Sequence, residues 1–183
     1  MPGRLTFRKT MGNLNLEYLK EFAKGDTFIE TGTYEGDTVA LADQYGFKNI
    51  HSIEIEPTLY ELCQLRFSNI EHIKIWHGDS IDMLEKVMAE VRGQATFWLD
   101  AHASGPLLGG KISCPLVEEI NIIGKHQDNH VFFIDDCRLF GSGEWRYLKK
   151  EDVVDTIFNI NPRYRFKYLD GSVANDIMVA YTI

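Results

Sequence analysis

The chain has 183 residues, a hydrophobic fraction of 44% and a formal net charge of −8. A chain of this length most simply folds as one domain, so we predict a single domain over residues 1–183, with an N-terminal arm and helix within 1–25. The negative net charge argues against broad nucleic-acid binding. No apolar run is long enough to span a bilayer. Three dispersed cysteines and an N-terminus without a secretory signal favour a cytoplasmic, reducing compartment.

Strand-like and helix-like segments alternate along most of the chain. A first helix is predicted from Asn13 to Lys24, and the first four strand candidates begin roughly 22 residues apart. The five strand candidates span residues 28–30, 50–54, 72–76, 97–100 and 131–135. The helical stretches between them span residues 37–45, 57–68, 80–91 and 115–125. This alternation predicts a parallel sheet with helices on both of its faces.

The regular alternation of strand and helix candidates ends after residue 140. A helix is predicted over 150–160, followed by two strands, 164–169 and 176–181, which are joined through Asp170-Gly171-Ser172. An Asp-Gly turn without an intervening helix predicts an antiparallel pair. The predicted fold is therefore α/β, with a Rossmann-like, doubly wound, mostly parallel seven-stranded sheet that ends in a C-terminal antiparallel hairpin.

Residues 27–41 read as a strand, a tight glycine turn and the start of a helix. Gly32 allows the chain to turn sharply and lets a ligand approach the backbone, and the free amides at the helix start can bind polar ligand groups. The alternative is an ordinary strand-to-helix turn whose glycines serve geometry alone. This opening is typical of nucleotide-binding α/β units.

Acidic residues follow all five parallel strand candidates. Ligands bind at the carboxyl ends of the strands in such sheets, so these acids are a candidate site. They are Glu30, Glu54, Asp79, Asp100 and the pair Asp135-Asp136. A single acid there is usually a turn former or a helix cap, whereas five strands in succession exceed what a sheet requires. Glu54, about 20 positions beyond Gly32, can accept both ribose hydroxyls of an adenosine-containing ligand. Glu30 beside the turn disfavours a pyrophosphate and favours the ammonium of an amino-acid moiety.

The segments Glu30-x-Gly32-x-x-x-Gly36, Glu54 and Gly78-Asp79-Ser80 resemble the cofactor motifs of class I S-adenosylmethionine-dependent methyltransferases. The resemblance covers about residues 26–183. It implies that Glu30 and Gly32, with Thr33 and Gly36 of the same turn, bind the methionine part of S-adenosylmethionine. It also implies that Glu54 binds the ribose, that Asp79 and Ser80 contact the adenine, and that Asp100 borders the cofactor. One departure is Tyr34, which stands where the family has a second glycine.

Two further segments, Phe97–His102 and Phe133–Asp136, resemble those of magnesium-dependent, macrocin O-methyltransferase-like enzymes that act on sugars. The resemblance implies that Asp100, Asp135 and Asp136 hold Mg²⁺ or another hard divalent cation. Neighbouring strand ends can bring these carboxylates together, and carboxylates suit such a cation. The alternative is that Asp135 caps the following loop and Asp136 points elsewhere.

His102, two residues beyond Asp100, is the candidate general base, and Asp100 is the second candidate catalytic residue. A histidine that only orients its loop is the alternative. The loops 103–111 and 138–147 are candidates for the acceptor site, in which Trp145 could stack on a sugar ring.

These observations predict a Mg²⁺-assisted O-methyltransferase for a sugar, glycoside or other polyhydroxylated small molecule, with no nucleic acid and no membrane as partner. Two alternatives stay open: a metal-independent methyltransferase and a non-catalytic module that binds S-adenosylmethionine. An NAD-linked oxidoreductase fits less well because the third glycine of its fingerprint is missing. Homo-oligomerisation is also left open.

Overall fold

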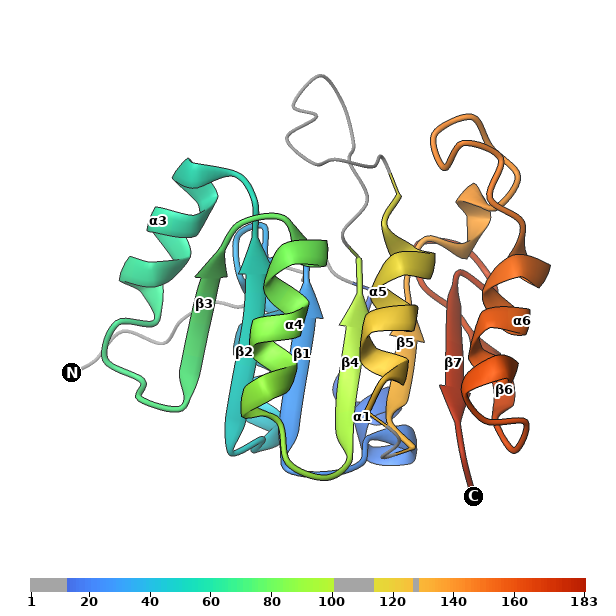
Figure 1. The fold of residues 1–183 in the computed structure, drawn as a ribbon. Helices are drawn as coiled ribbons and strands as arrows, with labels where there is room; N and C mark the ends of the chain where they lie inside the picture. Colours follow the sequence, from blue (N-terminus) through green and yellow to red (C-terminus); the bar gives the residue numbers. More distant parts are fainter. Residues whose placement is uncertain (1–12, 101–113, 127–128) are drawn as a thin grey trace.

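The computed structural model describes residues 13–100, 114–126 and 129–183, and these form one seven-stranded sheet flanked by helices (Figure 1). The strand order is β3-β2-β1-β4-β5-β7-β6. The strands are β1 (Thr27–Thr31), β2 (Asn49–Glu54), β3 (Ile73–His77), β4 (Ala95–Leu99), β5 (Val131–Ile134), β6 (Arg165–Leu169) and β7 (Ile177–Tyr181). Strands β1 to β5 are mutually parallel, and β7 runs antiparallel to both β5 and β6. The predicted fold class is confirmed.

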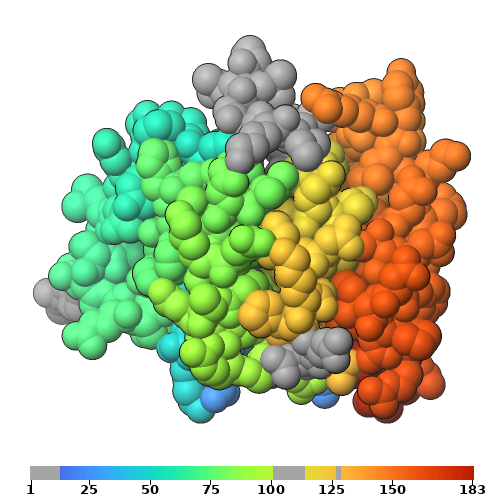
Figure 2. All heavy atoms as spheres, viewed as in Figure 1, coloured from blue at the N-terminus to red at the C-terminus, as the bar shows by residue number. Residues whose placement is uncertain are grey.

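The helices divide between the two faces of the sheet because successive side chains of each strand point to opposite sides. They are α1 (Leu16–Phe22), α2 (Asp37–Tyr45), α3 (Pro57–Arg66), α4 (Ser80–Glu90), α5 (Leu116–Gly124) and α6 (Lys150–Ile160). One core contains buried residues of α4, α5 and α6 together with Phe97 and Phe132, and the other contains residues of α1, α2 and α3 together with Trp98 and Phe133. Figure 2 shows α4, α5 and α6 covering the first of these faces.

Local sequence signals explain where the helices begin and end. Pro57 starts α3 behind Glu56, whose carboxylate accepts a hydrogen bond from the Leu59 amide, and Gly46 ends α2 in a left-handed conformation. The antiparallel pairing of β6 with β7 is confirmed, and residues 170–176 connect the two strands, as the predicted strand bounds require to within one residue. Within this connection, Asp170 and Asp176 accept hydrogen bonds from the amides of Asn175 and Ser172. Across the described residues, no helix has the length and apolarity needed to cross a membrane.

Candidate functional site

The carboxyl ends of β1, β2, β4 and β5 lie in register at one edge of the sheet. Thr31 pairs with Ile53 and with Leu99, and Leu99 pairs with Ile134. Backbone hydrogen bonds continue one step further, from the Gly32 amide to Ile53, from the Asp100 amide to Thr31 and from the Asp135 amide to Leu99. The next row across the sheet therefore consists of Gly32, Glu54, Asp100 and Asp135. The register thus brings together the strand-end acids that the sequence predicts as a site.

Buried hydrogen bonds hold the glycine turn after β1. The Ser52 hydroxyl donates to Glu30 Oε2 at 2.6 Å and lies 2.6 Å from the Thr33 hydroxyl, so the two strands and the turn are tied together. Gly32 and Gly36 have φ angles of 88° and 81°, and Tyr34 has a φ angle of 51°. Tyr34 therefore adopts the left-handed backbone that a glycine would supply at its position. Glu30 is buried behind the turn, where it positions the loop.

The remaining candidate cofactor residues bind the local backbone. Glu54 accepts hydrogen bonds from the amides of Tyr34 and Glu56, each at 2.8 Å, and so links the glycine turn to the start of α3. Asp79 caps α4 by accepting a hydrogen bond from the Ile81 amide at 3.0 Å, and Ser80 is buried at the first position of that helix. A carboxylate oxygen can accept more than one hydrogen bond, so these contacts leave Glu54 able to accept ribose hydroxyls.

Buried acidic side chains gather along this edge of the sheet. Burial raises the pKa of Glu30 to about 8, the pKa of Glu119 to about 7 and the pKa of Asp135 to about 7, and the charge of Asp100 raises all three further. Asp100 therefore lies at the centre of a group of acids. Such a group repels an anionic pyrophosphate and favours cationic ligands, including a sulfonium, an ammonium or a metal ion.

Glu119 is a member of this group that the sequence analysis missed. It lies in the first turn of α5, is 1% exposed and accepts a long hydrogen bond from the Thr31 hydroxyl at 3.3 Å. The sequence contained a sign of its burial, because Glu119 lies on the helix face that buries Leu116, Ile120 and Ile123. An acid on the apolar face of a helix indicates a buried polar contact.

Glu30 makes the stability of the protein depend on pH. Its pKa rises from 4.5 in the unfolded chain to about 8 in the folded protein. The stabilisation that it contributes is therefore fully present below pH 4.5 and is lost as the pH rises through about 8. We expect Glu30→Gln, which cannot ionise, to flatten this dependence and to exceed the wild type in unfolding free energy at pH 8.5 by at least about 1 kcal/mol.

Urea denaturation of both proteins between pH 5 and pH 8.5 measures this difference. Glu61→Gln, which makes the same charge change on the exposed side of α3, is the control and should follow the wild-type curve. Parallel curves for the wild type and Glu30→Gln would show that Glu30 is already ionised in the folded protein.

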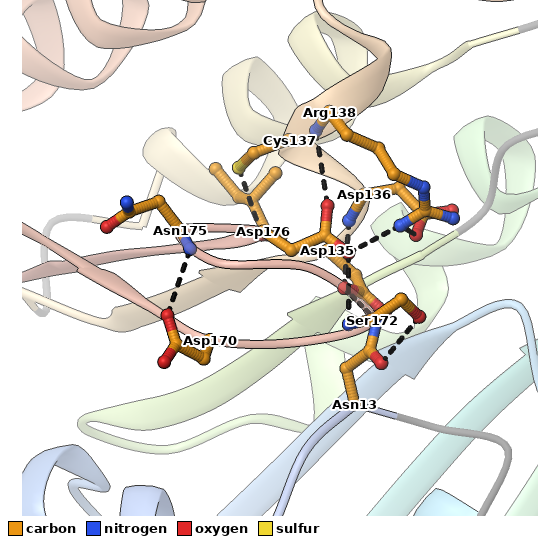
Figure 3. Close-up of polar contacts among 10 residues, drawn as sticks. Asn13, Asp135, Asp136, Cys137, Arg138, Asp170, Ser172, Asn175 and Asp176 are labelled. Carbon is orange, nitrogen blue, oxygen red and sulfur yellow. Dashed lines mark hydrogen bonds and ion pairs between the residues drawn. The ribbon is translucent and has the colours of Figure 1, made fainter.

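An acidic cluster lies where β5 meets the start of β7 (Figure 3). One carboxylate oxygen from each of Asp135, Asp136 and Asp176 lies within 4.8 Å of the other two. Arg138 forms ion pairs with Asp136 and with Asp176, and the Asn13 amide donates to both oxygens of Asp135 at 2.8 and 3.0 Å. The structure thus brings Asp135 and Asp136 together with an acid that the sequence analysis had placed only in a strand.

The register of β5 with β7 explains how Asp176 joins the cluster. Ile134 pairs with Met178, and the antiparallel register continued by two residues places Asp136 opposite Asp176. A buried acid at the start of a strand that pairs with β5 was the signal available in the sequence.

The donor set of the cluster fits a hard divalent cation. Carboxylate oxygens are the ligands that Mg²⁺ prefers, and the pKa of Asp135 is raised by burial and then by the charge of Asp100. The described acids close enough to share one ion are Asp135, Asp136 and Asp176; Asp100, the third predicted ligand, is not among them, and its role as a ligand stays a prediction. Arg138 forms an ion pair with Asp136, and the Asn13 amide donates hydrogen bonds to Asp135.

Two predictions about the acceptor side have different outcomes. His102 and the loop 103–111 lie outside the described residues, so the role of His102 stays a prediction. Trp145 was expected to stack on a sugar ring, but its side chain is 3% exposed and packs edge-on against Phe140. It belongs to the core and lines a small cavity with Asp100 and Glu119, so it presents no open surface to an acceptor.

Known proteins with a similar architecture were found among solved structures. No family model matches the sequence, and the search of curated proteins gives no match. Among solved structures, a proposed rRNA methylase from Clostridium thermocellum is 11% identical with a TM-score of 0.64, and the alignment covers 92% of this chain and 95% of the other.

An O-methyltransferase from Bacillus cereus in complex with S-adenosylhomocysteine is 14% identical with a TM-score of 0.63, covering 92% of this chain and 78% of the other. Fibrillarin from Aeropyrum pernix with bound S-adenosylmethionine is 16% identical with a TM-score of 0.55, covering 87% and 67%. The chain therefore has the Rossmann-like fold of S-adenosylmethionine-dependent methyltransferases.

Proposed function

We propose that this protein is an S-adenosylmethionine-dependent methyltransferase that methylates a hydroxyl group of a sugar, glycoside or other polyhydroxylated small molecule with the help of a divalent cation. The observation that carries the proposal is the row of strand ends with Gly32, Glu54, Asp100 and Asp135 at one edge of a methyltransferase-type sheet. The solved structures of this fold include an O-methyltransferase with bound S-adenosylhomocysteine.

The charges of the described residues support S-adenosylmethionine as the cofactor. Its sulfonium and ammonium groups are cationic, and Glu30, Glu54 and Asp100 lie close enough for the charges of Glu54 and Asp100 to raise the pKa of Glu30, after burial. A dinucleotide would bring an anionic pyrophosphate to the same turn. Glu54 would bind the ribose hydroxyls, and the Gly32 turn would approach the methionine part.

The acidic cluster supports a role for a divalent cation on the acceptor side. When bound, such a cation lowers the pKa of a coordinated hydroxyl and orients it. Asp100, Asp135 and Asp136 would hold the ion, and His102 would accept the proton of the acceptor hydroxyl. The protein itself supplies positioning and a site shielded from water, which account for much of the acceleration of a methyl transfer.

Metal-independent methylation is the second candidate, and one observation favours it. The Asn13 amide and the Arg138 guanidinium already bind Asp135 and Asp136, so these carboxylates do not depend on an ion for partners. A module that binds the cofactor without turnover shares the same pocket. A small-molecule acceptor is favoured over nucleic acid because the net charge of −8 opposes binding to phosphates.

Calorimetry and a turnover assay test the proposal in two steps. We expect S-adenosylmethionine and S-adenosylhomocysteine to bind the protein and NAD not to bind. Polyhydroxylated acceptors are then screened for the release of S-adenosylhomocysteine with Mg²⁺ and with EDTA. Turnover that EDTA abolishes and Mg²⁺ restores supports the cation, whereas equal turnover in EDTA supports the metal-independent candidate. Failure to bind S-adenosylmethionine would contradict the whole proposal.

The use of cysteine in the sequence supports a proposal for the cellular location of the protein. Cys63, Cys114 and Cys137 are dispersed along the sequence and match no disulfide framework or zinc motif. We propose a cytoplasmic enzyme on this basis.

A further inference from the structure

The acidic cluster after β5 contains its own counter-ion, and that counter-ion contacts one of the predicted metal ligands. Arg138 uses a single nitrogen, Nη1, for both ion pairs: it contacts Asp136 Oδ1 and lies 2.5 Å from Asp176 Oδ2 (Figure 3). Arg138 begins the loop 138–147, which the sequence predicts near the acceptor site. The structure instead directs its side chain back onto the carboxylates.

The two carboxylates that Arg138 bridges are not equivalent. The Asp176 side chain is fully buried, and it also accepts hydrogen bonds from the backbone amides of Arg138 and Ser172, each at 3.2 Å. A carboxylate so enclosed needs its positive partner, because an uncompensated buried charge is strongly unfavourable. The Asp136 side chain is 11% exposed, whereas the Arg138 side chain is 37% exposed. The contact with Asp136 is therefore the one that can be exchanged.

A guanidinium and a divalent cation that both contact the Asp136 carboxylate repel each other, so each weakens the binding of the other. Arg138 contacts Asp136 Oδ1 directly, and two positive charges within a few ångströms repel each other strongly when they are partly shielded from water. A cation at Asp135 and Asp136 would also supply the positive charge that Arg138 provides there. Asp176, whose side chain three protein donors already engage, stays the partner of Arg138 in both states.

We propose that Arg138 competes with the divalent cation for Asp136: its guanidinium bridges Asp136 and Asp176 and would leave Asp136 when a cation binds. The inference rests on the proposed use of a cation. It assigns to Asp176 the role of holding Arg138 rather than that of a metal ligand. Arg138 thereby offsets part of the negative charge of the cluster and lowers the affinity of the cluster for a cation.

Mn²⁺ binding to EDTA-treated, dialysed protein, measured by calorimetry and by the loss of the free Mn²⁺ spin-resonance signal, tests the competition. The variant R138M/D176N removes Arg138 together with Asp176, leaves the net charge unchanged and does not leave the fully buried Asp176 carboxylate without its cation. We expect it to bind Mn²⁺ at least about 5-fold more tightly than the wild type. The control R163M/D155N makes the same change of charges at exposed positions outside the cluster and should bind Mn²⁺ as the wild type does.

The single variant R138M supplies a second readout that does not depend on affinity. Without divalent cations its melting temperature should fall below that of the wild type, because Asp136 and Asp176 lose their counter-ion. Mg²⁺ should then raise its melting temperature more than it raises that of the wild type.

Wild-type or weaker Mn²⁺ affinity in R138M/D176N, or no Mn²⁺ binding by either protein, would overturn the inference. S-adenosylmethionine calorimetry on the same samples distinguishes a failure of the Arg138 inference from a failure of the proposed function. Cofactor binding without any effect of Arg138 on Mn²⁺ leaves the methyltransferase standing, whereas absent cofactor binding contradicts the proposed function whatever Mn²⁺ does.

Discussion

Asp135→Asn is expected to lower cation-dependent methyl transfer by about 100-fold, which corresponds to about 2.7 kcal/mol of transition-state stabilisation. Asp135 lies in the row of strand ends and in the acidic cluster, and it is the predicted ligand on which the charge of Asp100 acts. Its loss should weaken Mn²⁺ binding while the affinity for S-adenosylmethionine stays within about 3-fold, because the cofactor residues lie on β1, β2 and the start of α4. Initial rates at saturating cofactor, together with Mn²⁺ calorimetry, measure these effects.

A matched control distinguishes the loss of a ligand from a general change of charge. Asp155→Asn alters an exposed acid on α6 and should retain wild-type turnover. Thermal denaturation of Asp135→Asn checks that the fold is kept, since the Asn13 amide can still donate to the remaining carbonyl oxygen. Full turnover of Asp135→Asn in the presence of EDTA would remove the cation from the mechanism.

Glu54→Ala is expected to weaken the binding of S-adenosylmethionine by about 100-fold. The proposed contacts are two charge-assisted hydrogen bonds from the ribose hydroxyls, and together they are worth about 3 kcal/mol. The carboxylate also accepts hydrogen bonds from the amides of Tyr34 and Glu56, so its loss frees the glycine turn at the same time. Calorimetric titration with S-adenosylhomocysteine measures the effect without turnover.

Glu56→Ala is the control for Glu54→Ala, because it lies in the same loop and removes a cap of α3 without a proposed contact to the cofactor. We expect it to lower the melting temperature slightly and to keep cofactor affinity within about 3-fold. Equal losses of affinity in the two variants would indicate that loop order, and no ribose contact, explains the role of Glu54.

The parallel part of the fold follows from local signals. Apolar runs of strand length alternate with helices that carry clear start and stop residues, such as Pro57 and Gly46, and the structure agrees with the predicted elements to within a few residues. The acids at the strand ends could be predicted as a group because parallel strands in register present their carboxyl ends at one edge. The hydrogen bonds that Asp170 and Asp176 form with amides inside the connection 170–176 could not be predicted, since they depend on the conformation of that loop.

The contacts between segments that are distant in sequence were the least predictable part of the site. Trp145 occurs in a glycine-containing loop typical of the surface, yet it is buried against Phe140 and the core of α5 and α6. Arg138 begins the loop 138–147 that was predicted near the acceptor, and its partners are Asp136 and Asp176, which lies 38 positions away. Charge alone indicates that a residue needs a partner, while the three-dimensional packing decides which partner it has.

The order in which the ribosome produces the chain bears on how the two halves of this edge arise. The glycine turn, Glu54 and Asp100 all belong to β1–β4 and the segments that directly follow them, a continuous stretch of polypeptide. The acidic cluster instead joins Asn13, ahead of α1, to Asp135 and to Asp176 at the start of β7. During synthesis, the cofactor half can therefore form before the cluster, which stays incomplete until the last hairpin docks.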